Sequence, residues 1–205
     1  MNHYDSTSGE RLSMSHSVRR FQLKEATSRS HDAVDRAVGS FEDRASYEAY
    51  LKATYAFRVP LERQLAAVDW SNGFEDWRPR FLEPLIRADL ADLDLSIDQE
   101  TMGSTSDEES EAPGGDPSTL FGTLYVLEGS TLGAQVLFRR AASLGLTGEF
   151  GARHLAGQSA GVSNWRRFLD LLENAEPISI DRAAAASNRA FGHAERAFRA
   201  FRDAD

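Results

Sequence analysis

The chain has 205 residues, of which 41% are hydrophobic and 27% are charged, and it contains no cysteine. This length suits one globular domain, and the lack of cysteine excludes disulfides, zinc–thiolate sites, iron–sulfur clusters and cysteine nucleophiles. The net charge is −9, and the acidity is concentrated between Arg87 and Arg139, where there is no Lys or Arg; an acidic chain of this kind argues against nucleic-acid binding.

Residues 1–17 are polar and lack the apolar stretch of a signal peptide. No apolar run approaches the roughly 20 residues of a membrane span. We therefore expect a cytoplasmic protein with no membrane association, in which residues 1–17 are a disordered arm and residues 18–205 form a single helical domain.

The first predicted helix runs from about Ser17 to Val38, because its apolar residues recur at intervals of three and four. Gly39 follows it, as is common after the last turn of a helix. The pattern predicts that His31 points toward the core. Lys24 lies two turns earlier on nearly the same face, about 10 Å away by helical rise.

Further helices are expected over residues 46–67, with a kink at Pro60, and over residues 77–93. Residues 96–117 are acidic and rich in Gly and Pro, and we expect a mobile loop there. Later helices are expected over 118–144, 150–155 and 164–174, followed by a last helix capped by Asp181. No stretch alternates as a strand does, so the predicted fold is all-α.

The helix over residues 118–144 carries Gly129 and Gly133, four residues apart and therefore on nearly the same face. Each glycine inside a helix costs roughly 1 kcal/mol relative to alanine, so a flat face here needs a reason. Either another helix packs closely against it, or a large flat ligand lies on it. The spacing alone leaves both interpretations open.

The common catalytic motifs are absent: there is no dinucleotide-binding or P-loop glycine pattern, no Glu-x-x-His pair and no nucleophile elbow. A haem held between two helices would use both unusual features, with the His31 imidazole on the iron and the glycines against the ring. Taken singly, each residue has an ordinary explanation: His31 as a core histidine, Lys24 as a solvated charge and Tyr125 as a half-buried core residue.

Residues 23–27 (LKEAT), followed by Ser30 and His31, and much later residues 122–133 (GTLYVLEGSTLG), resemble the bacterial haem oxygenases. The closest likeness is to the type that accompanies bacterial phytochromes, and the resemblance extends from about residue 23 to residue 201. It implies an all-helical domain with haem between two helices. In the site that this resemblance implies, His31 is the proximal iron ligand, and Lys24 and Tyr125 contact the propionates. Gly129, Ser130 and Gly133 belong to the distal helix, and Arg80 is a distal-side arginine.

The resemblance further implies that haem b is both substrate and cofactor, opened to biliverdin, CO and ferrous iron with O2 and an external electron donor such as a ferredoxin, a reductase or ascorbate. A bacteriophytochrome is an expected recipient of the biliverdin, and a monomer is the expected state. Gly129 and Gly133 would control access to the ring while Ser130 holds water, so Gly129→Leu is expected to fold but not to open the ring.

Some residues depart from the family pattern. His154 and Gln158 stand where aromatic side chains are common, and residues 57–58 stand where helix two usually has a polar residue, which implies a rearranged distal water network. Two other readings remain open. One is a haem-binding or haem-trafficking protein without turnover, and the other is a ligand-free helical interaction domain.

Overall fold

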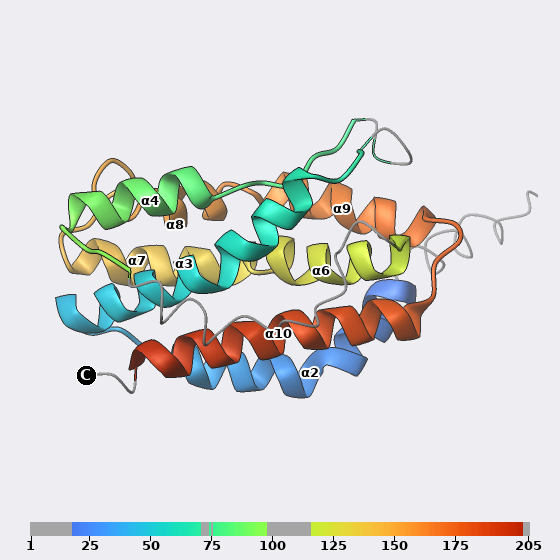
Figure 1. Ribbon diagram of the computed structural model, residues 1–205, viewed down its shortest axis with the longest axis horizontal. Coiled ribbons are helices and arrows are strands. Elements are labelled where there is room, and N and C mark those ends of the chain that lie inside the picture. Colours follow the sequence, from blue (N-terminus) through green and yellow to red (C-terminus); the bar gives the residue numbers. More distant parts are fainter. Residues whose placement is uncertain (1–17, 71–73, 75, 98–115, 203–205) are drawn as a thin grey trace, which may run out of the picture.

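The computed structural model describes residues 18–70, 74, 76–97 and 116–202, and the regular structure in these ranges is helical (Figure 1). The prediction of an all-α fold is confirmed; within the described residues, β-type pairing is limited to isolated bridges of Thr147 with Phe150 and Gly151. The helices are α2 (Val18–Val38), α3 (Arg44–Ala66), α4 (Glu83–Asp92), α6 (Pro117–Gly129), α7 (Thr131–Ser143), α8 (Arg153–Ser159), α9 (Val162–Asn174) and α10 (Ile180–Arg202).

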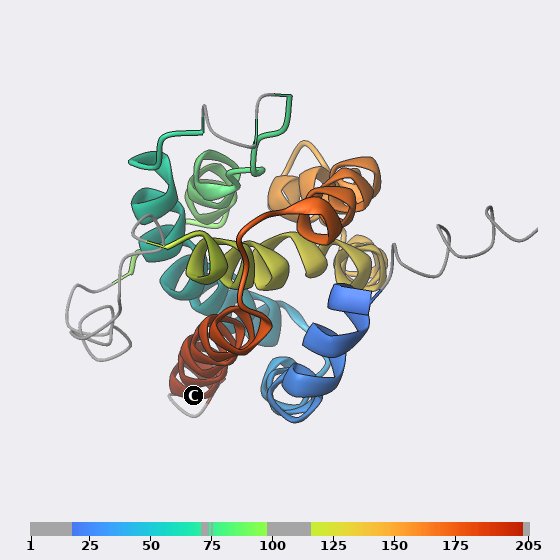
Figure 2. The same ribbon diagram turned by 90° about the vertical axis from the view of Figure 1, so that its right-hand side faces the viewer.

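Helix α6 crosses the centre of the molecule, with α2 and α10 on one side of it and α4 and α9 on the other (Figure 2). α10 packs against α2, α3 and α6, whereas α7 packs mainly against α8, and α4 is held between α3 and α8. The buried apolar side chains of these helices form one continuous core. α2 and α7 are not among the closely packed pairs of described helices.

Several predicted boundaries are correct because their local signals are strong. α3 begins after Asp43, whose carboxylate accepts a hydrogen bond from the Ser46 amide at 2.9 Å in a capping box. Pro60 lies inside α3, as expected. α2 ends before Gly39, which adopts a φ of +60° that glycine tolerates without strain.

Other boundaries were predicted wrongly. The helix expected from residue 77 begins only at Glu83, with Pro84 in its first turn, where proline costs least. The short helix expected at 150–155 begins at Arg153. Asp181 lies within the first turn of α10; the cap is Ser179, whose hydroxyl accepts from the Arg182 amide at 3.4 Å.

The long helix expected over residues 118–144 is broken. α6 ends at Gly129, α7 begins at Thr131, and Ser130 lies between them. Neither half contains an internal proline, so periodicity alone could not reveal the break. We call the junction formed by residues 129–131 the bend.

The first and last described helices depend on each other. The Arg202 guanidinium donates to the carbonyl oxygens of Arg36 and Ala37 at the end of α2, at 3.2 and 3.3 Å. In the middle of α2, the Ser30 hydroxyl donates to Asn188 of α10 at 2.7 Å. The position of α2 is therefore set by the other end of the chain.

The predicted N-terminal arm (residues 1–17) and most of the predicted acidic loop (96–117) lie outside the described residues. Among the helices that are described, none combines the length and the hydropathy that crossing a membrane requires.

Candidate active site

His31 lies on the surface of α2, and its side chain is 59% exposed, so the prediction that it points into the core is wrong. Its Nδ1 lies 3.2 Å from the Asp35 carboxylate, one turn further along. A histidine that donates from Nδ1 to a carboxylate keeps the lone pair on Nε2, which is the arrangement found in metal-ligating histidines. The imidazole also packs edge-to-face with Phe191 of α10, and the two ring centroids are 5.6 Å apart.

Tyr125 brings α6 to the same part of α2. Burial raises the pKa of its phenol, and two groups of α2, Arg20 and the Thr27 hydroxyl, act in the opposite direction. Thr27 is one turn before His31, so Tyr125 lies near the part of α2 that carries His31. Lys24, also on α2, is exposed.

The two glycines of the predicted flat face have different surroundings. A Cβ at Gly129 would lie 3.4 Å from Cη2 of Trp165, so the α9 indole covers this position. A Cβ at Gly133 would meet nothing within 4 Å. A Cβ at Gly129 would thus make an ordinary contact with the indole, and protein packing gives no reason for a glycine at position 133.

The glycine required by close helix packing is a different one. A Cβ at Gly122 would lie 2.1 Å from the carbonyl oxygen of Ala183, so α6 and α10 can approach only because position 122 has no side chain. The sequence pattern suggested close helix packing at Gly129 and Gly133, and Gly122 was not predicted to have this role.

Ser130 uses its hydroxyl within the protein. The hydroxyl donates to the Leu127 carbonyl oxygen at 2.6 Å and accepts from the Gln158 amide at 2.5 Å. Arg58 adds a longer contact at 3.4 Å. One donor and two acceptor positions are all that a hydroxyl offers.

Arg58 and Glu62 form a buried ion pair beneath the bend. Their side chains are 4% and 2% exposed, and Arg58 Nε lies 2.8 Å from a Glu62 carboxylate oxygen. The guanidinium also donates to the carbonyl oxygens of Leu127, at 3.3 Å, and Arg80, at 3.4 Å. The four-residue spacing of the pair is visible in the sequence, but its burial is not.

Arg80 joins this region through its main chain. Its amide donates to Glu128 at 2.8 Å, and its side chain packs at Gly161, between α8 and α9. The second oxygen of Glu128 accepts from Asn164 at 3.0 Å. Burial raises the pKa of Glu128, while these hydrogen bonds and the nearby arginines oppose the shift.

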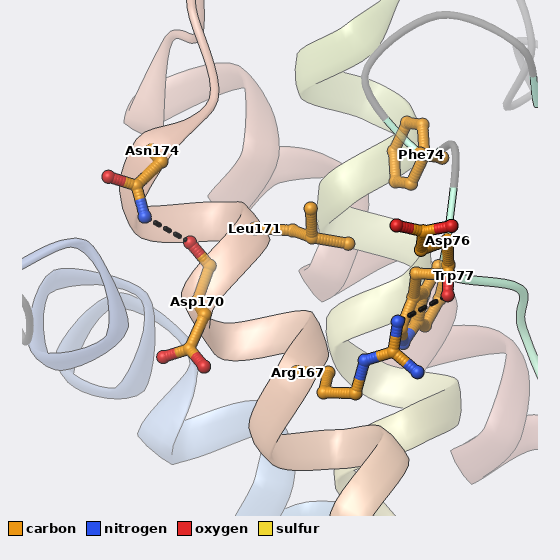
Figure 3. A pocket seen from close by; sticks show the side chains of 7 residues that line it. All are labelled: Phe74, Asp76, Trp77, Arg167, Asp170, Leu171 and Asn174. Carbon is orange, nitrogen blue, oxygen red and sulfur yellow. Dashed lines mark hydrogen bonds between the residues drawn. The ribbon is translucent and has the colours of Figure 1, made fainter.

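A surface pocket lies elsewhere, between α9 and the side chains of Phe74, Asp76 and Trp77 (Figure 3). Arg167 donates across it to the carbonyl oxygen of Asp76. None of the residues predicted for the site lines this pocket, whose walls are Phe74, Asp76, Trp77, Arg167, Asp170, Leu171 and Asn174.

The family model for heme oxygenase matches residues 20–204. The chain belongs to the haem oxygenase family. It is 31% identical over 191 residues to heme oxygenase PigA of Pseudomonas aeruginosa, an alignment that covers 88% of this chain and 93% of the relative. A crystal structure of the haem oxygenase of Neisseria meningitidis superimposes with a TM-score of 0.65 at 26% identity, covering 89% of this chain and 92% of the other.

These matches confirm the predicted family, fold and enzyme class, an oxidoreductase that cleaves haem. The residues predicted for the haem site are distributed over several elements: His31 and Lys24 on α2, Tyr125 on α6, Gly129 and Ser130 at the bend, Gly133 on α7, and Arg80 between α3 and α4. The sequence analysis missed Glu62, which supports Arg58, and it did not anticipate that Gln158 would reach Ser130.

Proposed function

We propose that this haem oxygenase binds haem b with His31 as the proximal ligand and the bend on the distal side, and converts it to biliverdin, CO and ferrous iron. The observation that carries this assignment is the pairing of an exposed His31, oriented through Nδ1 by Asp35, with a Gly133 that no protein atom requires. A haem bound between α2 and α7 would account for both the exposed His31 and the glycine at position 133.

The residues present fit the group. His31 would hold the iron through Nε2, while Lys24 and Tyr125 would meet the propionates, the first by charge and the second by its hydroxyl. On α7, Leu132 and Val136 beside Gly133 are 53% and 43% exposed, and exposed apolar side chains of this kind suit contact with a flat hydrophobic ligand.

When bound, haem supplies both the iron at which O2 is activated and the ring that is oxidised. On the first turn of α7 the protein's part is steric, because Gly133 carries no side chain and no protein atom would meet a Cβ there. The carboxylates of Glu62 and Glu128 accept from backbone amides, so both are engaged within the protein. Since the Ser130 hydroxyl is already satisfied, we assign Ser130 to holding the bend rather than to holding water.

Addition of hemin to the purified protein tests the assignment. We expect tight uptake with a Soret band, followed by its loss and a green biliverdin product when ascorbate or a ferredoxin system is supplied. His31→Ala should abolish the ligated spectrum, whereas Asp32→Ala, which changes the next exposed residue of α2, should leave it unchanged. A Soret band that survives reductant and oxygen would instead support haem binding or trafficking without turnover.

The resemblance to the phytochrome-associated type adds three finer proposals: a soluble electron-donor protein, a bacteriophytochrome as recipient of the biliverdin, and action as a cytoplasmic monomer. Comparing turnover with ferredoxin, with a flavin reductase and with ascorbate tests the donor. Transfer of the pigment to an apophytochrome added to the reaction tests the recipient.

A further inference from the structure

Two buried carboxylates cap helices to which they do not belong. One Glu62 oxygen, on α3, accepts from the amides of Leu82 and Glu83 at 2.8 Å each. These amides begin α4, whose own N-cap residue has no side-chain hydrogen bond. Because the first amides of a helix have no partner within it, Glu62 fixes the start of α4 relative to α3.

Asp89 repeats the arrangement one helix later. This α4 carboxylate is 0% exposed and accepts from the amides of Arg153 and His154 at 2.9 Å each. Those amides begin α8, whose N-cap residue, Ala152, has no side chain that could cap it. Asp89 also lies 2.7 Å from His154 Nδ1, so it holds the first turn of α8 both by its backbone and by a side chain.

The last turn of α8 then reaches the bend. Gln158, one turn after His154, donates to the Ser130 hydroxyl at 2.5 Å. Arg58, held by Glu62, donates to the Leu127 carbonyl, which the end of α6 leaves without a helical partner. Polar contacts therefore run in a closed circuit from α3 through α4 and α8 to the bend and back to α3.

We propose that Gln158 and Arg58 are positioning residues, which together clamp the bend through Ser130 and the Leu127 carbonyl and so set where Gly133 stands over the haem ring. The assignment deepens the proposed function and rests on it for the ring, whereas the clamp itself is a property of the haem-free protein. Supporting groups of this kind hold a site to within a fraction of an ångström.

The clamp formed by Gln158 and Arg58 is expected to influence which edge of the haem ring is oxidised, and therefore which biliverdin isomer is formed. Gly133 lies three residues after Ser130, in the first turn of α7, so a change of geometry at Ser130 is expected to move Gly133 relative to α6. Neither Gln158 nor Arg58 has to touch haem to change the outcome. Loosening the clamp should therefore broaden the mixture of biliverdin isomers without removing the iron ligand.

Amide hydrogen exchange on the haem-free protein provides the direct test. Two amides report on the bend: that of Ser130, within it, and that of Ala134, in the first turn of α7, which donate to the carbonyl oxygens of Val126 and Ser130 at 3.2 and 3.1 Å. In Gln158→Leu we expect exchange of these amides to become about tenfold faster, because the local opening that exchange reports would cost less free energy. Amides of α10 should keep their rates, and Gln22→Leu, which changes an exposed glutamine of α2, should match the unsubstituted protein throughout.

A second measurement uses the loaded enzyme. Gln158→Leu should take up haem with the same stoichiometry and release a broader isomer mixture, as resolved by chromatography of the biliverdin. Unchanged exchange at the bend would overturn the clamp, and so would an unchanged isomer mixture. Failure of the unsubstituted protein to open haem would overturn the proposed function while leaving the exchange result intact, so the two failures are distinguishable.

Discussion

The Asp89 carboxylate lies 2.7 Å from Nδ1 of His154, and both side chains are fully buried. The same carboxylate accepts two backbone amides, so it acts as an acceptor and His154 carries its proton on Nδ1. His154 thus donates from Nδ1 to Asp89, and its burial favours the neutral form of the ring.

Acidification should therefore destabilise the protein through His154. Burial lowers the pKa of His154 below its ordinary 6.5, although Asp89 opposes the shift. As pH falls from about 6.5 toward the lowered value, the unfolded chain takes up a proton that the folded one does not, so the free energy of unfolding decreases by up to about 1.4 kcal/mol per pH unit. Urea unfolding at several pH values should show this slope reduced in His154→Leu; an identical slope in the variant would contradict the assignment.

Gly133→Ala should separate stability from function. Because a Cβ there meets no atom, the haem-free variant should gain about 0.5–1 kcal/mol from the better helix propensity of alanine. The added methyl group should at the same time slow ring opening. Denaturant unfolding without haem and turnover with haem measure the two effects, and a variant that is stabilised with normal turnover would remove Gly133 from the site.

Gly122→Ala provides the contrast. Its Cβ would fall 2.1 Å from the Ala183 carbonyl oxygen, so α6 and α10 would have to separate. We expect a loss of about 3 kcal/mol or more, at the upper end of overpacking costs. Thermal unfolding of the haem-free protein measures it, and a change below 1 kcal/mol would show that the two helices can move apart.

Asp35→Ala should weaken haem binding without removing the ligand. Partners that orient a ligating histidine typically change affinity 10- to 100-fold, and because the Asp35 side chain is 68% exposed we expect about tenfold. Hemin titration measures the affinity, and Asp32→Ala, an adjacent exposed acid on α2, is the control. Equal affinities in the two variants would mean that Asp35 does not orient His31.

Arg58→Met should cost about 3 kcal/mol, since it leaves the Glu62 charge buried without its partner. Adding Glu62→Gln removes that charge and keeps an oxygen for the α4 amides, so the double variant should recover part of the loss. A double-mutant cycle by urea unfolding gives the coupling energy. Additive effects would show that the pair is not coupled.

The sequence predicted the fold well because most helices combine a clear apolar period with a local start or stop signal. Asp43 before α3 and Gly39 after α2 are signals of this kind. The break at Ser130 has one local signal, the Gly129–Ser130 pair, which is typical of helix kinks, but its geometry also depends on contacts from Arg58 and Gln158, 72 and 28 residues away. Periodicity carries no information on contacts at that separation.

The residues of the candidate site were predicted mainly from the resemblance to a known family, and less from their own spacing and chemistry. The glycine spacing was informative, but the flat face has a tryptophan over Gly129 and open space only at Gly133. The structure consequently argues against the expectation that Gly129→Leu folds normally, because the larger side chain would run into Trp165. The inward orientation expected of His31 failed for a related reason: a ligand-binding face and a core face have the same apolar period.

The pairing of α2 with α10 also concerns the order in which the molecule is made. A ribosome delivers the N-terminal end of a chain first, so His31 emerges well before Asn188, Phe191 and Arg202, which hold its helix in place. A nascent chain lacking α10 would carry the iron ligand on an unsupported helix. Haem capture is therefore expected to await release of the finished polypeptide, and C-terminal truncation should abolish it although no deleted residue binds iron.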